Sequence, residues 1–573
     1  MTALDTASTP GAPAPPAEQP SGRKYSSWVG NETLEDYSLR YAPTTFRRWS
    51  EMTVATTALG GIAYLADFAI GGSIILSHGF VNAVLAILVA AVTIFLTGIP
   101  IAYYSAKYAI DMDLLTRAAG FGYFGSTLTS VVYASFTFIF FALEGSIMAQ
   151  AFNTGFGLPL AIGYLVASLI VNPFVIFGMT ALAKLQVWTQ PIWLALMVAP
   201  FVSIALQEPG AYARWTHFTG TGTSSSFSAI GVGAGAGVAL SLIAQIGEQV
   251  DYLRFMPQKH KGNAGRWWFA VIAAGPGWVV LGALKQLGGA FLTFFIAGSV
   301  GLKVANEPIR QYLGGFGTFI GAGLMAVAVF FIVLSQIKIN VVNAYSGSLS
   351  WSNFFSRVLH WHPGRVVWIF FNIGIALALM EAGVFGFLNT VLGFYSNVAI
   401  AWIGAIVADL VVNKPLRLSP PVIEFKRAHL YAVNPVGFGA MLVGSVVSIA
   451  AFYNAFGAMA QAWSPYIALA LAFVLSPVIA KATKGKYYIA RADTLEPALL
   501  ADSGQLSTAV LNCTVCSTDY ERPDMAACPF HAGPICSLCC SLDKACHDVC
   551  RKPSSGVIDL DTPTVGAVRS TGT

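Results

Sequence analysis

The fold can be worked out from one stretch, Ser241-Leu-Ile-Ala-Gln-Ile-Gly-Glu-Gln-Val-Asp-Tyr-Leu-Arg-Phe255. It ends an otherwise apolar segment that opens with the glycine-rich run Gly231-Val-Gly-Ala-Gly-Ala-Gly-Val238. At helical spacing, one face carries the polar residues Ser241, Gln245, Glu248 and Tyr252. A polar stripe inside a membrane span is costly unless it meets partners or a water-filled cavity, so it predicts a functional site.

The end of this stretch has a simpler interpretation. We expect Asp251, Arg254 and Phe255 to lie where the helix emerges into the cytoplasm. The glycines before Ser241 loosen the helix, as is expected where backbone lines a binding cavity.

The composition is that of a multi-pass membrane protein. Of 573 residues, 55% are hydrophobic and only 10% are charged, and 56 are glycine. The net charge of +5 does not indicate a nucleic-acid partner, because the basic residues lie in connections next to the membrane. We find no nucleophile–base motif and no phosphate-binding loop, so the chain is not predicted to be an enzyme.

Apolar runs of about 20 residues predict twelve membrane spans in an all-α protein. Their approximate bounds are 53–78, 81–106, 127–152, 158–183, 188–206, 228–250, 268–298, 316–342, 366–382, 386–412, 436–458 and 463–480. If both termini are cytoplasmic, the outer connections hold only three basic residues, Arg214, Lys303 and Arg310. The positive-inside rule therefore predicts a cytoplasmic (inner) membrane protein with both ends inside.

The first span also has an interruption. In Leu59-Gly-Gly-Ile-Ala-Tyr-Leu-Ala-Asp-Phe-Ala-Ile-Gly-Gly72, two glycine pairs flank a short run that contains Asp67. Broken spans at positions one and six are typical of two five-helix repeats that are inverted in the membrane. The binding site of such a protein lies near the midplane, where the broken helices face each other, so Asp67 is a candidate site residue. Lys285, in the seventh span, is interpreted as snorkelling towards the interface.

The chain divides into five regions by composition. We expect a disordered cytoplasmic tail over 1–45, a transmembrane domain over 46–490 and a linker over 491–511. A Cys/His-rich module follows over 512–552, and a short disordered tail over 553–573.

All eight cysteines lie in this last module, between Cys513 and Cys550. Closely spaced pairs on the reducing side of a membrane are typical of metal ligands rather than of disulfides. The ten candidate ligands are Cys513, Cys516, Cys528, His531, Cys536, Cys539, Cys540, Cys546, His547 and Cys550. They could fill two four-ligand Zn²⁺ sites with two to spare; an iron–sulfur cluster is the alternative.

Three stretches resemble the nucleobase:cation symporter family, which includes cytosine, purine, allantoin and hydantoin permeases. They are Asp251-Tyr-Leu-Arg-Phe255, Tyr104-Ser-Ala-Lys-Tyr-Ala-Ile-Asp-Met-Asp-Leu-Leu-Thr-Arg117 with Gly120-Phe-Gly-Tyr-Phe-Gly125, and Asn340-Val-Val-Asn-Ala-Tyr-Ser-Gly-Ser-Leu349. With the span layout, the likeness covers roughly residues 31–490. It implies a leucine-transporter-like fold, with ten core helices plus two, that carries a small planar heterocycle.

The resemblance also implies substrate contacts. Family members often place Trp-x-x-x-Gln on the third helix, and the matching positions here are Phe140 and Glu144. Phe140 could stack on a substrate ring, and Glu144 is expected to be protonated or paired. The aromatic residue that the family often has early in the sixth helix is Leu242 here.

Gln336, Asn340 and Asn343 share a face of the eighth helix. Their amides suit either the edge of a nucleobase or bonds between helices.

The largest departure from the family pattern is at the residues that would hold a coupling sodium ion. Sodium-coupled members have two Ser/Thr hydroxyls before the asparagine of the eighth helix, where this chain has Lys338 and Ile339. A lysine ammonium could replace sodium electrostatically, so sodium coupling is not expected. Lys338 with Glu144 or Glu248 could couple to protons, or the same groups could form a purely structural pair.

Two functions remain open at this stage. The first is a secondary active transporter of a nucleobase or related heterocycle. The second is a permease-derived membrane receptor that reports substrate, metal or redox state through the Cys/His module to a cytoplasmic signalling partner.

Overall fold

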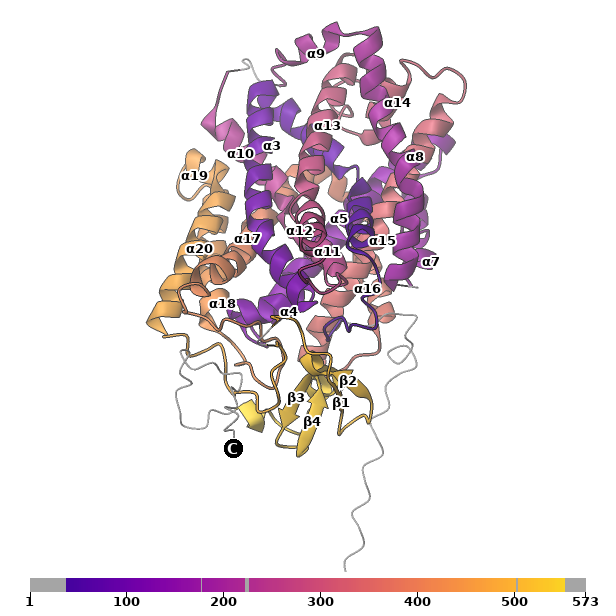
Figure 1. The fold of residues 1–573 in the computed structure, drawn as a ribbon. Coiled ribbons are helices and arrows are strands. Elements are labelled where there is room, and N and C mark those ends of the chain that lie inside the picture. The colour runs from indigo at the N-terminus through magenta and orange to yellow at the C-terminus, as the bar shows by residue number, and fades with distance from the viewer. Residues whose placement is uncertain (1–37, 177, 222–225, 501–502, 552–573) are drawn as a thin grey trace, which may run out of the picture.

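The computed structural model describes residues 38–176, 178–221, 226–500 and 503–551 (Figure 1). Most of the expected N-terminal tail (1–45), and all of the expected C-terminal tail (553–573), lie outside the described residues. The rest is a helical bundle with a small β-containing module against one end (Figure 1). The connection that contains α4 (Met112–Thr116) lies at the same end of the bundle as the module.

Nine helices in the described part of the chain are long and apolar enough to cross a membrane, and a shorter apolar stretch covers Leu160–Val175. The protein is thus a multi-pass membrane protein. The twelve predicted spans correspond in order to α2 with the first part of α3 (Glu51–Gly60, Ala66–Tyr108), the rest of α3, α5 (Ser126–Phe156), α6 with α7 (Leu160–Leu169, Asn172–Val175), α8 (Gly178–Gln207), α10 with α11 (Ala229–Ala239, Gln245–Leu253), α12 with α13 (Ala264–Ala274, Trp278–Val300), α15 (Leu324–Leu359), α16 (Arg365–Glu381), α17 (Leu388–Ala408), α18 (Pro435–Phe452) and α20 (Ser464–Ala482). The short helices α9 (Gly210–Trp215), α14 (Pro308–Phe316) and α19 (Ala458–Ala462) lie in connections.

Both predicted interruptions are present. The first span breaks between α2 and α3, where Gly61–Ala63 form a 3-10 turn and Tyr64 is non-helical; we call residues 61–65 the first break. The sixth span is wound as a 3-10 segment over Leu240–Ala244, between α10 and α11. The first and second spans are separated inside α3 by Gly79, whose φ of 71° turns the chain in a conformation that favours glycine.

Two glycines bring α3 and α13 into backbone contact. A Cβ on Gly71 of α3 would lie 1.8 Å from the carbonyl oxygen of Gln286, and a Cβ on Gly289 of α13 would lie 2.3 Å from Cα of Phe68. Small residues at such crossings let helices approach closely in a bilayer. The contact brings α13, and with it Lys285, up to the first break.

The end of the sixth span differs from the prediction. Asp251 and Arg254 do not emerge from the bundle but are fully buried. Asp251 accepts hydrogen bonds from Tyr133 (2.9 Å) and Ser346 (2.6 Å), and Arg254 lies 3.5 Å from Asp111. Buried charges are tolerated when they are paired and hydrogen-bonded, which this network achieves by joining four segments.

The Cys/His module is built from two antiparallel hairpins and a short helix. Strand β1 (Val510–Asn512) pairs with β2 (Asp519–Glu521), β3 (Met525–Cys528) pairs with β4 (Gly533–Cys536), and α21 (Ser537–Leu542) follows. Figure 1 shows the module against the lower end of the bundle.

The α3–α13 contact predicts that Gly71→Ala is destabilising. The added methyl must separate two backbones, which costs about 1–3 kcal/mol or more. Gly298→Ala is the matched control, because Gly298 lies in α13, the other helix of this contact, and its Cβ would meet nothing within 4 Å. Melting of the detergent-purified variants measures the difference; equal melting temperatures would contradict the close approach.

Candidate functional site

The first break leaves backbone groups without helical partners, and Glu144 of α5 binds two of them. Its carboxylate accepts hydrogen bonds from the N–H groups of Leu65 (3.2 Å) and Ala66 (3.1 Å), at the start of α3. All three residues are fully buried. Because the apolar core of a bilayer offers no water to these donors, a carboxylate at this place stabilises the interruption.

Lys285 of α13 binds backbone carbonyl groups of the first break. Its Nζ donates to the carbonyl oxygens of Ile62 (2.5 Å) and Tyr64 (3.0 Å), and it lies 3.0 Å from Oδ2 of Asp67. Asp67 also accepts a 2.8 Å hydrogen bond from Gln286. The interpretation of Lys285 as a snorkelling side chain is therefore wrong: it is 3% exposed and its ammonium points into the bundle.

Polar side chains of the sixth and eighth spans lie beside this pair. Gln245 donates to Glu248 at 2.6 Å, Glu248 interacts electrostatically with Glu144, and Gln336 lies against Glu144. We call the group formed by Asp67, Glu144, Gln245, Glu248, Lys285 and Gln336 the polar centre. The sequence-predicted residues Asp67, Glu144 and Gln245 are thus brought together, and Lys285 is the member that sequence reasoning missed. A lysine and an aspartate in two apolar spans of the same chain were the signal for it.

Phe140, Asn340 and Asn343 lie near the same level of the bundle. Asn343 donates to Asn340 (3.1 Å), which in turn donates to the carbonyl oxygen of Phe141 (3.3 Å). The ring of Phe140 packs against Phe136 with a centroid distance of 4.6 Å and is 3% exposed.

Several buried polar atoms here have no hydrogen-bond partner among the described residues. They are Oε1 and Nε2 of Gln336, Oε1 of Glu248 and Oδ1 of Asn343. Such atoms are rare in folded proteins, because an unpaired buried donor or acceptor is costly, and each calls for a ligand, an ion or water.

Lys338 points elsewhere. Its Nζ donates to the carbonyl oxygen of Gln186 (3.1 Å) and to Oγ1 of Thr189 (2.9 Å), both on α8. The ammonium thus joins the eighth span to the fifth, and the lysine that contacts carboxylates near the first break is Lys285.

A cavity of about 390 Å³ lies between α8, α9 and α13. Its lining includes the aromatic residues Phe68, Phe201, Tyr212, Trp215 and Phe291, together with Lys285. Lys285, a member of the polar centre, thus also lines this cavity.

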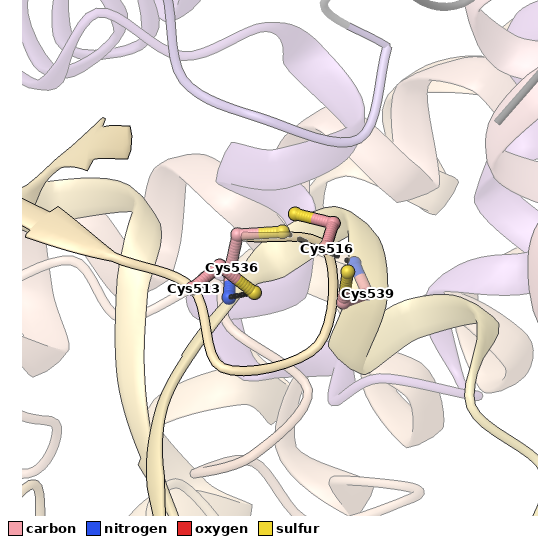
Figure 2. Close-up of side chains that lie close together, drawn as sticks. All are labelled: Cys513, Cys516, Cys536 and Cys539. Atoms are coloured by element: carbon pink, nitrogen blue, oxygen red, sulfur yellow. Dashed lines mark hydrogen bonds between the residues drawn. The ribbon is translucent and has the colours of Figure 1, made fainter. Parts of the chain in front are cut away.

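Four of the predicted metal ligands meet in the module. The thiol groups of Cys513, Cys516, Cys536 and Cys539 lie within 4.8 Å of one another and face a common point (Figure 2). A tetrahedral Zn²⁺ with Zn–S bonds of about 2.3 Å requires S···S separations of about 3.8 Å. The backbone N–H of Cys536 donates to Sγ of Cys513 (3.4 Å), and that of Cys539 donates to Sγ of Cys536 (3.3 Å). The four sulfur atoms are therefore placed to bind one metal ion as four thiolate ligands.

Ionisation of the four thiols is linked through their mutual hydrogen bonds. The bond with Cys516 opposes ionisation of Cys513, but those with Cys536 and Cys539 favour it, and the pKa of Cys513 falls to about 6. The hydrogen bond with Cys513 also lowers the pKa of Cys516. The same interactions raise the pKa of Cys536 well above its usual value. A thiol group that shares its protons in this way loses them to a metal ion that binds all four sulfurs.

The other six candidates are placed differently. Cys528, Cys540, Cys546 and Cys550 interact electrostatically, and burial raises the pKa of Cys540 to about 12. His531 lies 2.5 Å from Asp543, and His547 is exposed. A second metal site among these residues stays a prediction.

The thiol cluster predicts that Cys513→Ser with Cys516→Ser lowers the metal content of the purified protein by one equivalent. The membrane domain should keep its melting temperature, because the ligands lie outside it. Thr518→Ser is the control, since Thr518 is exposed beside the ligands. Elemental analysis measures the loss; full metal content in the double variant would contradict the assignment.

The fold was compared with known proteins. No protein-family model matches the chain, and no curated protein matches its sequence. Among solved structures, it is similar to Mhp1, a nucleobase-cation-symport-1 family transporter, in a closed conformation with bromovinylhydantoin bound. The identity is 18%, the match covers 78% of this chain and 98% of that one, and the TM-score is 0.56.

Two further solved structures are similar. The inward-facing conformation of Mhp1 is 15% identical over 77% of this chain and 93% of that one, with a TM-score of 0.54. A substrate-bound, outward-open Na⁺-coupled sialic acid symporter is 13% identical over 82% of this chain and 95% of that one, with a TM-score of 0.55. At such identities the likeness concerns the fold, and the leucine-transporter-like fold expected from the sequence is confirmed.

Proposed function

We propose that the protein is a secondary active transporter of a nucleobase or a related small heterocycle across the cytoplasmic membrane, and that both termini are cytoplasmic. The observation that carries the proposal is the set of unpaired buried polar atoms on Gln336, Glu248 and Asn343, beside a break in the first span. Structures with the same fold include a transporter solved with a hydantoin bound, and transport at a broken span suits that architecture.

The chemistry of these side chains fits a planar heterocycle. An amide offers one acceptor and two donors, which match the alternating N–H and C=O groups of such a ring. Phe140 supplies an aromatic face at the same level, and the neighbouring Phe136 extends it. Asn340 and Asn343 are proposed as further contacts, with Asp67, Glu144 and Gln245 shaping the polar wall.

A Gln336→Leu variant tests the site. If the amide contacts substrate, its loss should lower uptake by about 5- to 150-fold, since a substrate hydrogen bond is worth about 1–3 kcal/mol. The melting temperature should change little, because the amide lies against the Glu144 carboxylate but makes no close hydrogen bond in the described protein. Uptake of labelled cytosine, purines, allantoin and hydantoins into proteoliposomes, with and without a proton gradient, is the measurement.

Gln311→Leu is the matched control, because Nε2 of this buried glutamine donates to Phe68, Gly289 and Thr293. It should lose stability. Binding of a heterocycle without accumulation would favour the receptor alternative, and unchanged uptake by Gln336→Leu would contradict the proposed site.

For the module we propose a structural Zn²⁺ on Cys513, Cys516, Cys536 and Cys539, with an iron–sulfur cluster as the alternative. The ion would hold the two hairpins together, which a fragment this small cannot do by its hydrophobic core alone.

A regulatory role for the module is the second candidate, and its contacts with the bundle favour it. Arg427, between α17 and α18, donates to the carbonyl oxygen of Asp543 (2.7 Å) and pairs with Asp548 (2.7 Å). Glu521 accepts from the N–H of Thr44 (2.8 Å) just before α2. The module thus holds a segment before the first span and one after the tenth, at the two ends of the ten-helix core whose repeats would move against each other during transport.

Arg427→Ala should loosen the module and change the rate of uptake. Lys481→Ala is the control, because Lys481 is a basic residue that is exposed at the end of α20. Limited proteolysis reports release of the module, and uptake reports its effect. Faster release with an unchanged uptake rate would contradict a regulatory role.

A further inference from the structure

Three oxygen atoms around the first break form the surroundings of a small cation. Two are main-chain carbonyl oxygens of the interrupted helix, from Ile62 and Tyr64, and the third is Oδ2 of Asp67. Unwound carbonyls with a carboxylate are the groups that coordinate alkali cations in transporters with broken spans. Here all three oxygens lie within 3.0 Å of one Nζ atom, that of Lys285.

We propose that the Lys285 ammonium is a built-in substitute for a bound alkali cation at the first break, and that it makes this protein independent of sodium there. The inference deepens the proposed transport function, since it concerns the coupling ion. It assigns to Lys285 the role that was expected of Lys338, which instead binds α8.

The other groups around the ammonium also suit a cation. The ring of Tyr64 lies 3.6 Å from Nζ, so its π-face meets the charge. Among carboxylates, Asp67 pairs directly with Lys285 and Glu144 acts on it electrostatically. From α13 itself, Gln286 fixes the other oxygen of Asp67 at 2.8 Å. A fixed positive charge thus balances a carboxylate that would otherwise be buried alone.

The lysine is held in place by the helix crossing. Gly71 and Gly289 bring the α13 backbone against α3, and both contacts lie within the one turn of α13 that follows Lys285. The side chain therefore reaches the break and stays there. A diffusible cation, in contrast, could leave. A transporter that carries its own cation at this place binds no sodium there, and its coupling must use another group or ion.

Removal of the amine tests the proposal. In Lys285→Ala the three oxygens remain and the positive charge is lost, so Na⁺ should now bind. Melting of the purified full-length protein is measured in NaCl, KCl and choline chloride at equal ionic strength. We expect a saturable upward shift with Na⁺ for Lys285→Ala and none for the wild type.

Two further variants serve as controls. Lys338→Ala removes another buried lysine whose described contacts include no carboxylate, so it should gain no Na⁺ response. Lys285→Ala with Asp67→Asn removes the anionic oxygen as well, so it should lose the response of the single variant. Methylammonium should raise the melting temperature of Lys285→Ala, because it restores an amine between the same oxygens.

The outcomes separate this inference from the transport function. A Na⁺-dependent melting shift in the wild type, or no Na⁺ or methylammonium response in a folded Lys285→Ala, overturns the cation role. If Lys285→Ala does not fold, the wild-type protein decides: heterocycle uptake that requires Na⁺ overturns the proposal, and uptake unchanged in choline supports it. If no heterocycle is taken up, the proposed transport function fails, and the melting measurements still decide the cation role of Lys285.

Discussion

The structure depends on how the interrupted first span satisfies its own backbone. Where α2 stops and α3 begins, the chain leaves N–H groups on one side of the break and carbonyl groups on the other. Lipid offers no partner to either. Two charged side chains of opposite sign resolve this, since Glu144 accepts from Leu65 and Ala66 while Lys285 donates to Ile62 and Tyr64.

This arrangement fixes the positions of the helices around it. Glu144 ties α5 to the start of α3, and Lys285 ties α13 to the end of the break. The Gly71–Gly289 crossing is what allows α13 to come so close. Between these helices and α15 lie the unpaired polar atoms of Gln336 and Asn343, so the same constraint that permits the break also concentrates polar groups beside it.

Much of this could be predicted from the sequence. Apolar runs located the twelve spans, and paired glycines around Asp67 located the first break, because both signals are local in the chain. The partners of charged residues were harder to predict. Helical spacing tells which side chains share a face but not which neighbour that face meets, so Lys338 and Lys285 could not be told apart. Asp251 and Arg254 were expected where the helix emerges into the cytoplasm for the same reason, since their partners Tyr133 and Asp111 lie far away in sequence.

The contact of the module with the start of the bundle has a consequence for biosynthesis. Glu521 binds Tyr41 and Thr44, and Arg427 binds the segment after α21, although ribosomes make the module after the last span. The helices must therefore enter the bilayer before the module that contacts their lower end exists. These contacts therefore form only after the whole chain has been made.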